Sequence, residues 1–167
     1  MMMRLFCSDR PVSRRCPISL VIALVSAFAI VPCAHSEPVS QTSTGKKEYR
    51  SPESVQGAIT TSVDEAKSLY DQGVTFIDVR NPRFYAKGHI PGAHHLDYKY
   101  NYDEARLTAV ADRDKPVVIY CSGVVCSRSY RASASAVSWG FKAVHYFRGG
   151  IADWQKAGYP IEQLKVE

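Results

Sequence analysis

The chain has 167 residues, of which 46% are hydrophobic and 22% charged. This composition is typical of a soluble globular protein with one domain, and it excludes disordered, collagen-like and disulfide-dense scaffolds. Residues 1–36 supply +3 of the net charge of +5, so residues 37–167 carry only +2, with basic and acidic side chains interspersed. Nucleic-acid-binding proteins concentrate Lys and Arg in a run or on one face, so we expect no nucleic-acid partner.

The beginning of the chain has the pattern of an export signal. Arg14 and Arg15 precede an apolar stretch, residues 18–31, and small residues follow at Ala34 and Ser36. This order defines a secretory signal, so we predict that residues 1–36 are removed and that the mature chain is periplasmic or secreted, without stable membrane insertion. The alternative is an uncleaved anchor, but the stretch is shorter than the about 20 apolar residues that a spanning helix needs.

Residues 37–57 are rich in Ser, Thr, Gly, Pro and Lys and show no apolar periodicity. Such a segment is typical of a flexible tether or a loosely docked arm, so we expect the folded domain at residues 58–167. In that domain, Ser62 and Glu65 form the capping box of a first helix, which ends at Gly73. Apolar runs too short for helices predict three buried strands, at residues 74–79, 116–121 and 143–147.

Three further helices are expected at residues 103–110, 127–139 and 151–156. In the middle one, apolar residues at helical spacing predict the buried face; they are Tyr130, Ala134, Val137 and Phe141. Strands that are apolar on both faces and alternate with helices indicate an α/β fold, in which helices cover both faces of a parallel sheet.

Cys121 ends one of the predicted strands, and residues 122–127 must turn the chain sharply into the next helix. A loop that curls into a helix N-terminus directs its backbone N–H groups inward and forms an anion cradle. These N–H groups, with Arg128 at the rim, favour a thiolate and lower the pKa of Cys121 from its usual value of about 8.5. Cys121 is therefore a candidate nucleophile. The alternative is a buried structural thiol at a strand end.

Five short motifs follow one another along the chain: Phe76–Arg80, Gly88–Ala93, Val118–Cys121 with Arg128 and Ser129, Gly149–Ile151, and Trp154. In this order and spacing they resemble the signatures of a single rhodanese domain, over residues 57–161. The resemblance implies an α/β fold with a five-stranded, mainly parallel sheet. It also implies a nucleophilic cysteine, by position Cys121, that accepts sulfane sulfur as a persulfide and passes it to a thiol or cyanide. No cofactor is expected.

The same resemblance assigns the binding of a small sulfur-donor anion to the loop and the start of the next helix. These residues are Ser122, Gly123, Val124, Val125, Cys126, Ser127, Arg128 and Ser129. Typical sulfurtransferases of the family have four residues between the cysteine and the arginine, and Cdc25-like phosphatases have five, whereas this chain has six. The Cys-x4-Cys-x-Arg-Ser pattern is similar to a subgroup of exported single-domain rhodaneses.

Three functions remain in competition. The leading one is an exported sulfurtransferase that takes sulfur from thiosulfate or polysulfide and gives it to a thiol acceptor or cyanide. The second is a non-catalytic binding or redox-sensing module, whose usual mark, loss of the loop cysteine, is absent. The third is a Cdc25-like phosphatase or arsenate reductase, which the loop length disfavours.

The other motif residues are expected to have structural roles. Asp78 and Arg80 should form an ion pair at a strand end, and His89 should hydrogen-bond the turn that follows it. Gly149 and Gly150 should form a turn into the last helix, whose core anchor is Trp154.

Two further groups of side chains carry weaker expectations. His94 and His95 predict no metal site, because adjacent residues of a strand face opposite sides and no other ligand stands at a supporting spacing. Tyr98, Tyr100 and Tyr102 alternate along the chain, which predicts a half-buried extended segment.

Cys121 and Cys126 are the two cysteines of the expected mature chain. The four residues between them allow the Cα separation of about 4.4–6.8 Å that a disulfide requires. Such a bond would block Cys121 until a thiol reductant opened it, and Cys126 would then resolve a persulfide or sulfenic acid at Cys121. The alternative is that Cys126 only packs its side chain under the loop. The oligomeric state is not predicted.

Overall fold

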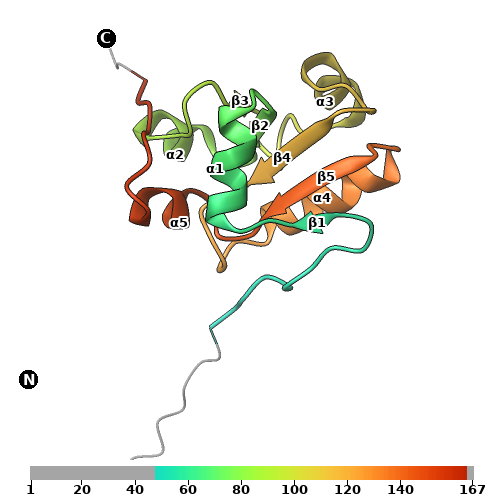
Figure 1. Ribbon diagram of the computed structural model, residues 1–167. Coiled ribbons are helices and arrows are strands. Elements are labelled where there is room, and N and C mark those ends of the chain that lie inside the picture. Colours follow the sequence, from blue (N-terminus) through green and yellow to red (C-terminus); the bar gives the residue numbers. More distant parts are fainter. Residues whose placement is uncertain (1–47, 165–167) are drawn as a thin grey trace, which may run out of the picture. The chain divides into compact units, whose positions relative to one another are not determined.

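A computed structural model describes residues 48–164 of the chain (Figure 1). The expected signal, residues 1–36, lies outside the described residues. The elements follow one another as β1 (Ile59–Thr60), α1 (Val63–Asp71), β2 (Thr75–Asp78), α2 (Pro82–Lys87), β3 (His94–His95), α3 (Glu104–Val110), β4 (Pro116–Tyr120), α4 (Arg128–Ser138), β5 (Ala143–Phe147) and α5 (Gly150–Lys156). Within residues 48–164, no helix has both the length and the apolar character needed to cross a membrane.

The strands form one five-stranded sheet in the order β1-β5-β4-β2-β3, and every pairing is parallel. The longest pairing joins β4 and β5, from Pro116 beside Ala143 to Tyr120 beside Phe147. The predicted α/β class and the parallel sheet are therefore confirmed. In a parallel sheet all strands end at the same edge, so the segments that follow β2, β3, β4 and β5 meet there.

Helices cover both faces of the sheet (Figure 1). On one face, α3 and α4 pack against alternate residues of β4, including Val117 and Ile119. On the other face, α1 and α5 pack against Val118 and Tyr120. Trp154 of α5 is fully buried there and donates a hydrogen bond from Nε1 to the Pro160 carbonyl at 2.8 Å, which confirms its role as a core anchor.

The predicted start of α1 is confirmed. The Ser62 side chain accepts a hydrogen bond from the Glu65 N–H, and Glu65 Oε2 accepts one from the Ser62 N–H at 2.8 Å. The hydrogen bond from the Ser62 backbone holds the pKa of Glu65 below its ordinary value. This capping box orients α1 as it enters from β1.

The buried face of α4 differs from the expected one. Its buried residues are Ser129, Ala132, Ser133 and Ala136, whereas Ala134 is exposed. Small side chains let the helix approach β4 and β5 closely, and close approach decides which face is buried here. Phe141, which follows α4, is buried in the core as expected, whereas Tyr130 and Val137 are only partly buried.

Asp78 and Arg80 form the expected ion pair, and both side chains are buried. Arg80 Nε lies 2.9 Å from both carboxylate oxygens of Asp78, and Arg80 Nη2 lies 2.6 Å from Oδ2 and 2.7 Å from the Gly88 carbonyl oxygen. The guanidinium therefore ties the end of β2 to the end of α2. Burial strongly raises the pKa of the neighbouring Tyr120, whose hydroxyl accepts a hydrogen bond from the Ile90 N–H.

His89 contacts the helix before it, and the prediction that it bonds the following turn is wrong. Its Nδ1 lies 3.0 Å from the carbonyl oxygen of Tyr85, and the two rings stack with their centroids 3.7 Å apart. The His89 N–H also donates to the Glu162 carbonyl. The imidazole is thus held between α2 and the C-terminal segment, a placement that depends on contacts distant in sequence.

Residues 48–57, the described part of the segment expected as a tether or arm, are packed against the domain. Ser51 and Val55 are buried. The Ser51 N–H donates to the Val124 carbonyl at 2.7 Å, and the Ser51 carbonyl accepts from Arg148 Nη2 at 2.9 Å. These contacts join the segment to the loop after β4 and to the end of β5.

Candidate active site

Cys121 directly follows β4 at the carboxyl edge of the sheet and is 1% exposed. A disulfide joins it to Cys126, with the two Cα atoms 6.3 Å apart. This separation lies in the range that disulfides require. The pairing expected as one alternative is therefore present, and Cys126 does more than pack under the loop.

The N-terminus of α5 holds the start of the loop. The Ile151 N–H donates to the Cys121 carbonyl at 3.0 Å, and the Ala152 N–H donates to the Ser122 carbonyl at 3.2 Å. Because the N–H and C=O of a trans peptide point in opposite directions, the N–H groups of Ser122 and Gly123 point away from α5. Neither N–H group has an acceptor among residues 48–164, so both can donate to an anion.

Gly149 and Gly150 make this contact possible. Gly149 is the N-cap of α5, and Gly150 has a φ of 56°, in the left-handed region. A Cβ at Gly150 would lie 2.2 Å from the Cys121 carbonyl oxygen. The expected turn into the last helix is therefore confirmed, and it has a second role: the glycine allows the backbone of α5 to touch the loop.

The rest of the loop is closed by two more carbonyl contacts. The Gly123 carbonyl accepts from the Cys126 N–H at 2.9 Å, and the Val124 carbonyl accepts from Ser51. Among residues 48–164, the N–H groups of residues 122–125 have no acceptor, and Ser127 makes no side-chain bond to the start of α4. These donors and the N-terminal end of the α4 dipole can bind an anion.

Arg128 stands at the start of α4, with its side chain 32% exposed. Its Nη1 lies 3.5 Å from Oδ1 of Asp97, a buried carboxylate that follows β3. The other Asp97 oxygen, Oδ2, has no partner among the described residues. Lys99 is nearby, and its hydrogen bond with Tyr100 raises the pKa of the amine. The site edge therefore carries two cations around one buried anion.

The remaining predicted loop residues differ in exposure. Val125 is 50% exposed at the tip, whereas Gly123 is buried under α5. Ser129 is fully buried, and its hydroxyl has no hydrogen-bond partner among residues 48–164. Ser129 therefore belongs to the close contact of α4 with the sheet.

The three tyrosines do not form the expected extended segment, because residues 98–101 form a turn. Tyr98 and Tyr102 instead pack against each other, with ring centroids 5.9 Å apart, and both contact the core cluster that contains Cys121. Burial strongly raises the pKa of Tyr102, which keeps its hydroxyl protonated as a donor to the Ala132 carbonyl. Tyr100 is 69% exposed.

Sequence reasoning missed Asp97 and Ser51 as neighbours of the site. Asp97 follows a strand of two residues, which is too short to produce a periodic pattern, so its position at the sheet edge had no sequence signal. Ser51 lies in a segment without apolar periodicity, and its role depends on a backbone N–H that any residue except proline has.

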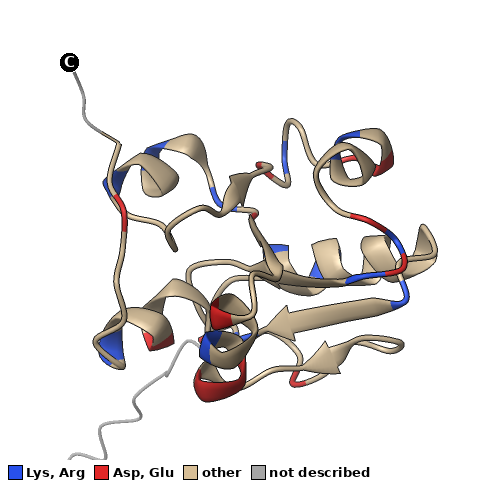
Figure 2. Cartoon of the chain, turned by 45° about the horizontal axis from the view of Figure 1, so that its top comes forward, with Lys and Arg blue, Asp and Glu red and all other residues tan. Residues whose placement is uncertain are grey.

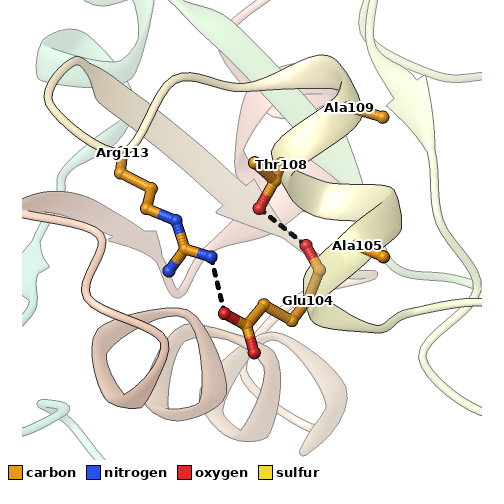
Figure 3. Close-up of a pocket in the computed structure, with 5 residues that line it drawn as sticks. All are labelled: Glu104, Ala105, Thr108, Ala109 and Arg113. Atoms are coloured by element: carbon orange, nitrogen blue, oxygen red, sulfur yellow. Dashed lines mark hydrogen bonds and ion pairs between the residues drawn. The ribbon is translucent and has the colours of Figure 1, made fainter.

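Two features of the described surface and one group of side chains can be compared with this site. The pocket in Figure 3 lies beside α3, where the Arg113 and Glu104 side chains pair with each other across it. Figure 2 shows Lys and Arg interspersed with Asp and Glu over the described elements. Within residues 48–164, no three His, Cys, Asp or Glu side chains gather as a metal site, and His95 Nε2 contacts the Arg80 carbonyl at 2.9 Å.

Comparison with known proteins places the chain in a family. Residues 62–157 match the rhodanese-like domain family. The thiosulfate sulfurtransferase GlpE of Pseudomonas fluorescens Pf-5 is 37% identical over 99 residues, which are 59% of this chain and 85% of that protein. GlpE of Pseudomonas aeruginosa LESB58 is 34% identical over 104 residues, covering 62% of this chain and 89% of that protein.

Solved structures show the same architecture. The Alr3790 protein of Anabaena has a TM-score of 0.56 at 27% identity, with 64% of this chain and 94% of that chain covered. A protein of Rhodopseudomonas palustris described as a possible tyrosine phosphatase has a TM-score of 0.52 at 28% identity, with 64% and 86% covered. The matched domain, the identity to GlpE proteins and the shared fold show that this chain belongs to the rhodanese-like domain family and is a homologue of thiosulfate sulfurtransferases.

Proposed function

We propose that the chain is a sulfurtransferase in which Cys121 takes a sulfane sulfur atom from thiosulfate or polysulfide and passes it to a thiol or cyanide. The observation that carries this proposal is the place of Cys121: it ends β4 beside backbone N–H groups that have no acceptor among the described residues. Relatives with 34–37% identity are named thiosulfate sulfurtransferases, which supports the same choice of donor.

With Cys121 reduced, its thiolate attacks the outer sulfur of thiosulfate. A bond forms between Cys121 Sγ and that sulfur, the S–S bond of thiosulfate breaks, and sulfite leaves with the electron pair. The inward N–H groups and the α4 N-terminus stabilise the thiolate, the incoming anion and the persulfide anion in turn. A thiolate or cyanide then takes the terminal sulfur and regenerates Cys121.

The proposed location is the periplasm or the outside of the cell, after removal of residues 1–36. The pattern of those residues supports this, and so does the Cys121–Cys126 disulfide, since disulfides persist in oxidising compartments. Membership of the exported subgroup with a Cys-x4-Cys-x-Arg-Ser loop is part of the same proposal.

The first test concerns the persulfide. Reduced Cys126→Ser protein is expected to gain the mass of one sulfur atom on exposure to thiosulfate, and Cys121→Ser protein to gain none, as measured by intact-mass spectrometry. Cys126→Ser should also produce thiocyanate from thiosulfate and cyanide. Equal labelling of both variants, or of neither, would rule out Cys121 as the sulfur carrier.

The second test concerns Arg128. Replacing it by alanine should raise the KM for thiosulfate by tenfold or more, because a charge-assisted hydrogen bond to an anion contributes about 1.5–3 kcal/mol. Asp97→Asn should lower the same KM, since it removes the anion that competes for Arg128 but keeps an oxygen for the Lys99 N–H. Arg131→Ala, an exposed position on α4, is the control. An unchanged KM in Arg128→Ala would place its charge outside the binding step.

A redox-sensing module without transfer activity is the second candidate function, because the same disulfide would serve as its sensor. The thiosulfate:cyanide assay on reduced protein separates the two, as a sensor would produce no thiocyanate.

A further inference from the structure

The disulfide between Cys121 and Cys126 removes the thiolate that sulfur transfer requires. A second cysteine within bonding reach of the sulfur carrier is therefore either a block on the reaction or a participant in it. The geometry of the loop favours the second alternative, in which Cys126 takes part in the transfer reaction and determines the product in which the sulfur leaves.

We propose that Cys126 resolves the Cys121 persulfide and releases its sulfur as hydrogen sulfide, which makes the chain a thiosulfate reductase that works with a dithiol reductant. This inference rests on the proposed persulfide at Cys121. The substrate is then an oxyanion with a sulfane sulfur, and the products are sulfite and sulfide.

The step balances as a thiol–disulfide exchange. The Cys126 thiolate attacks Cys121 Sγ, a bond forms between the two Sγ atoms, and the bond from Cys121 Sγ to the terminal sulfur breaks. The terminal sulfur leaves as hydrosulfide with the electron pair. Sulfane sulfur is reduced, the two protein thiols are oxidised, and the protons of both thiols end on the sulfide. The product is the disulfide present in the structure.

Backbone contacts fix the two cysteines relative to each other independently of the disulfide. The carbonyls of Cys121 and Ser122 bind N–H groups of α5, and the Val124 carbonyl binds Ser51. The Gly123 carbonyl accepts the Cys126 N–H at 2.9 Å, which closes the turn that brings Cys126 back toward Cys121. Because these bonds involve backbone atoms alone, opening the disulfide leaves the Cys126 side chain beside Cys121.

The exposures of Cys121 and Cys126 determine which of them an external dithiol attacks when it reduces the disulfide. Cys121 is 1% exposed, whereas Cys126 is half-buried and follows the exposed Val125. An external dithiol therefore reaches Cys126 first. Attack there releases Cys121 as the leaving thiolate, next to the N–H groups that stabilise it, and a leaving thiol of low pKa departs faster. Reduction thus restores the nucleophile directly.

A single-turnover experiment tests the inference. The full chain is reduced, freed of reductant and mixed with one equivalent of thiosulfate without any external thiol. We expect one equivalent each of sulfite and sulfide per chain and the loss of two free thiols, those of Cys121 and Cys126. The first-order rate constant for conversion of the persulfide to sulfide, measured after sulfite has been released, should not depend on protein concentration, because this exchange is intramolecular. Cys126→Ser should release sulfite but no sulfide and should retain the persulfide; Cys126→Ala provides the same test with a second side chain.

The outcomes separate this inference from the proposed function. Wild-type protein that keeps a stable Cys121 persulfide and a free Cys126 thiol, without sulfide, would overturn the reductase step and leave sulfur transfer intact. A rate constant for persulfide decay to sulfide that rises with protein concentration would also overturn it, since another chain would then be the acceptor. Absence of sulfite from wild type and Cys126→Ser alike would overturn the proposed function itself.

Discussion

Replacing Gly150 by alanine is expected to lower sulfur-transfer activity by about 100-fold, because small displacements of a reacting group can cost that much. The new Cβ would lie 2.2 Å from the Cys121 carbonyl oxygen and 3.1 Å from the Gly123 nitrogen. Both neighbours are backbone atoms that cannot rotate away, so α5 must separate from the loop. The hydrogen bonds from Ile151 and Ala152 to the loop carbonyls would then be lost.

The same substitution should also reduce stability. An alanine at the φ of 56° found at Gly150 costs about 1–2 kcal/mol, and each lost hydrogen bond costs about 1 kcal/mol more. Urea unfolding measures this loss. Gly73→Ala is the matched control, because Gly73 has a φ of 76° and nothing lies within 4 Å of its Cβ position. Gly73→Ala should lose only the about 1–2 kcal/mol of stability that an alanine at a left-handed φ costs, and it should keep full activity. If Gly150→Ala retained activity within a factor of about two, the α5 contact would not position the loop.

Replacing Asp78 by alanine is expected to lower the free energy of unfolding by about 3–5 kcal/mol, the usual cost of leaving a buried charge without its partner. Arg80 is 5% exposed, and without the Asp78 carboxylate its guanidinium keeps, among the described residues, one hydrogen-bond acceptor, the Gly88 carbonyl, and no anionic partner. The total free energy of unfolding of a domain of this size is about 5–15 kcal/mol. The variant should therefore be close to unfolding at ambient temperature.

Two controls show whether burial is the cause. Asp71 pairs with Lys67 on the surface of α1 at 2.6 Å, and Asp71→Ala should cost only about 0.3–0.5 kcal/mol. The double variant Asp78→Asn with Arg80→Met should recover part of the loss, because it removes both buried charges. Urea unfolding of all variants at neutral pH is the measurement. Equal losses for Asp78→Ala and Asp71→Ala would contradict the buried-charge explanation.

The longer elements and the place of Cys121 at a strand end were predictable from local sequence. The strands at residues 116–121 and 143–147 differ from β4 and β5 by at most one residue at an end, because buried parallel strands are continuous apolar runs. The capping box at Ser62 and Glu65 was equally clear, since both partners lie within one helical turn. Cys121 was the candidate nucleophile because of its place at a strand end. For Cys126 the short loop left both a disulfide and simple packing open, and the structure shows the disulfide.

Only the tertiary structure decided which surfaces meet. The strands β1 and β3 contain two residues each, too few for a periodic pattern. They form because their backbones pair with the neighbouring strands β5 and β2. Ala134 was expected to be buried and is exposed, because α4 packs on the sheet through the face that carries Ser129, Ala132, Ser133 and Ala136. Asp97 beside Arg128 and Ser51 beside Val124 join segments distant in sequence. The sequence by itself identified Cys121 as the candidate nucleophile, while long-range packing determined which charges and backbone contacts surround it.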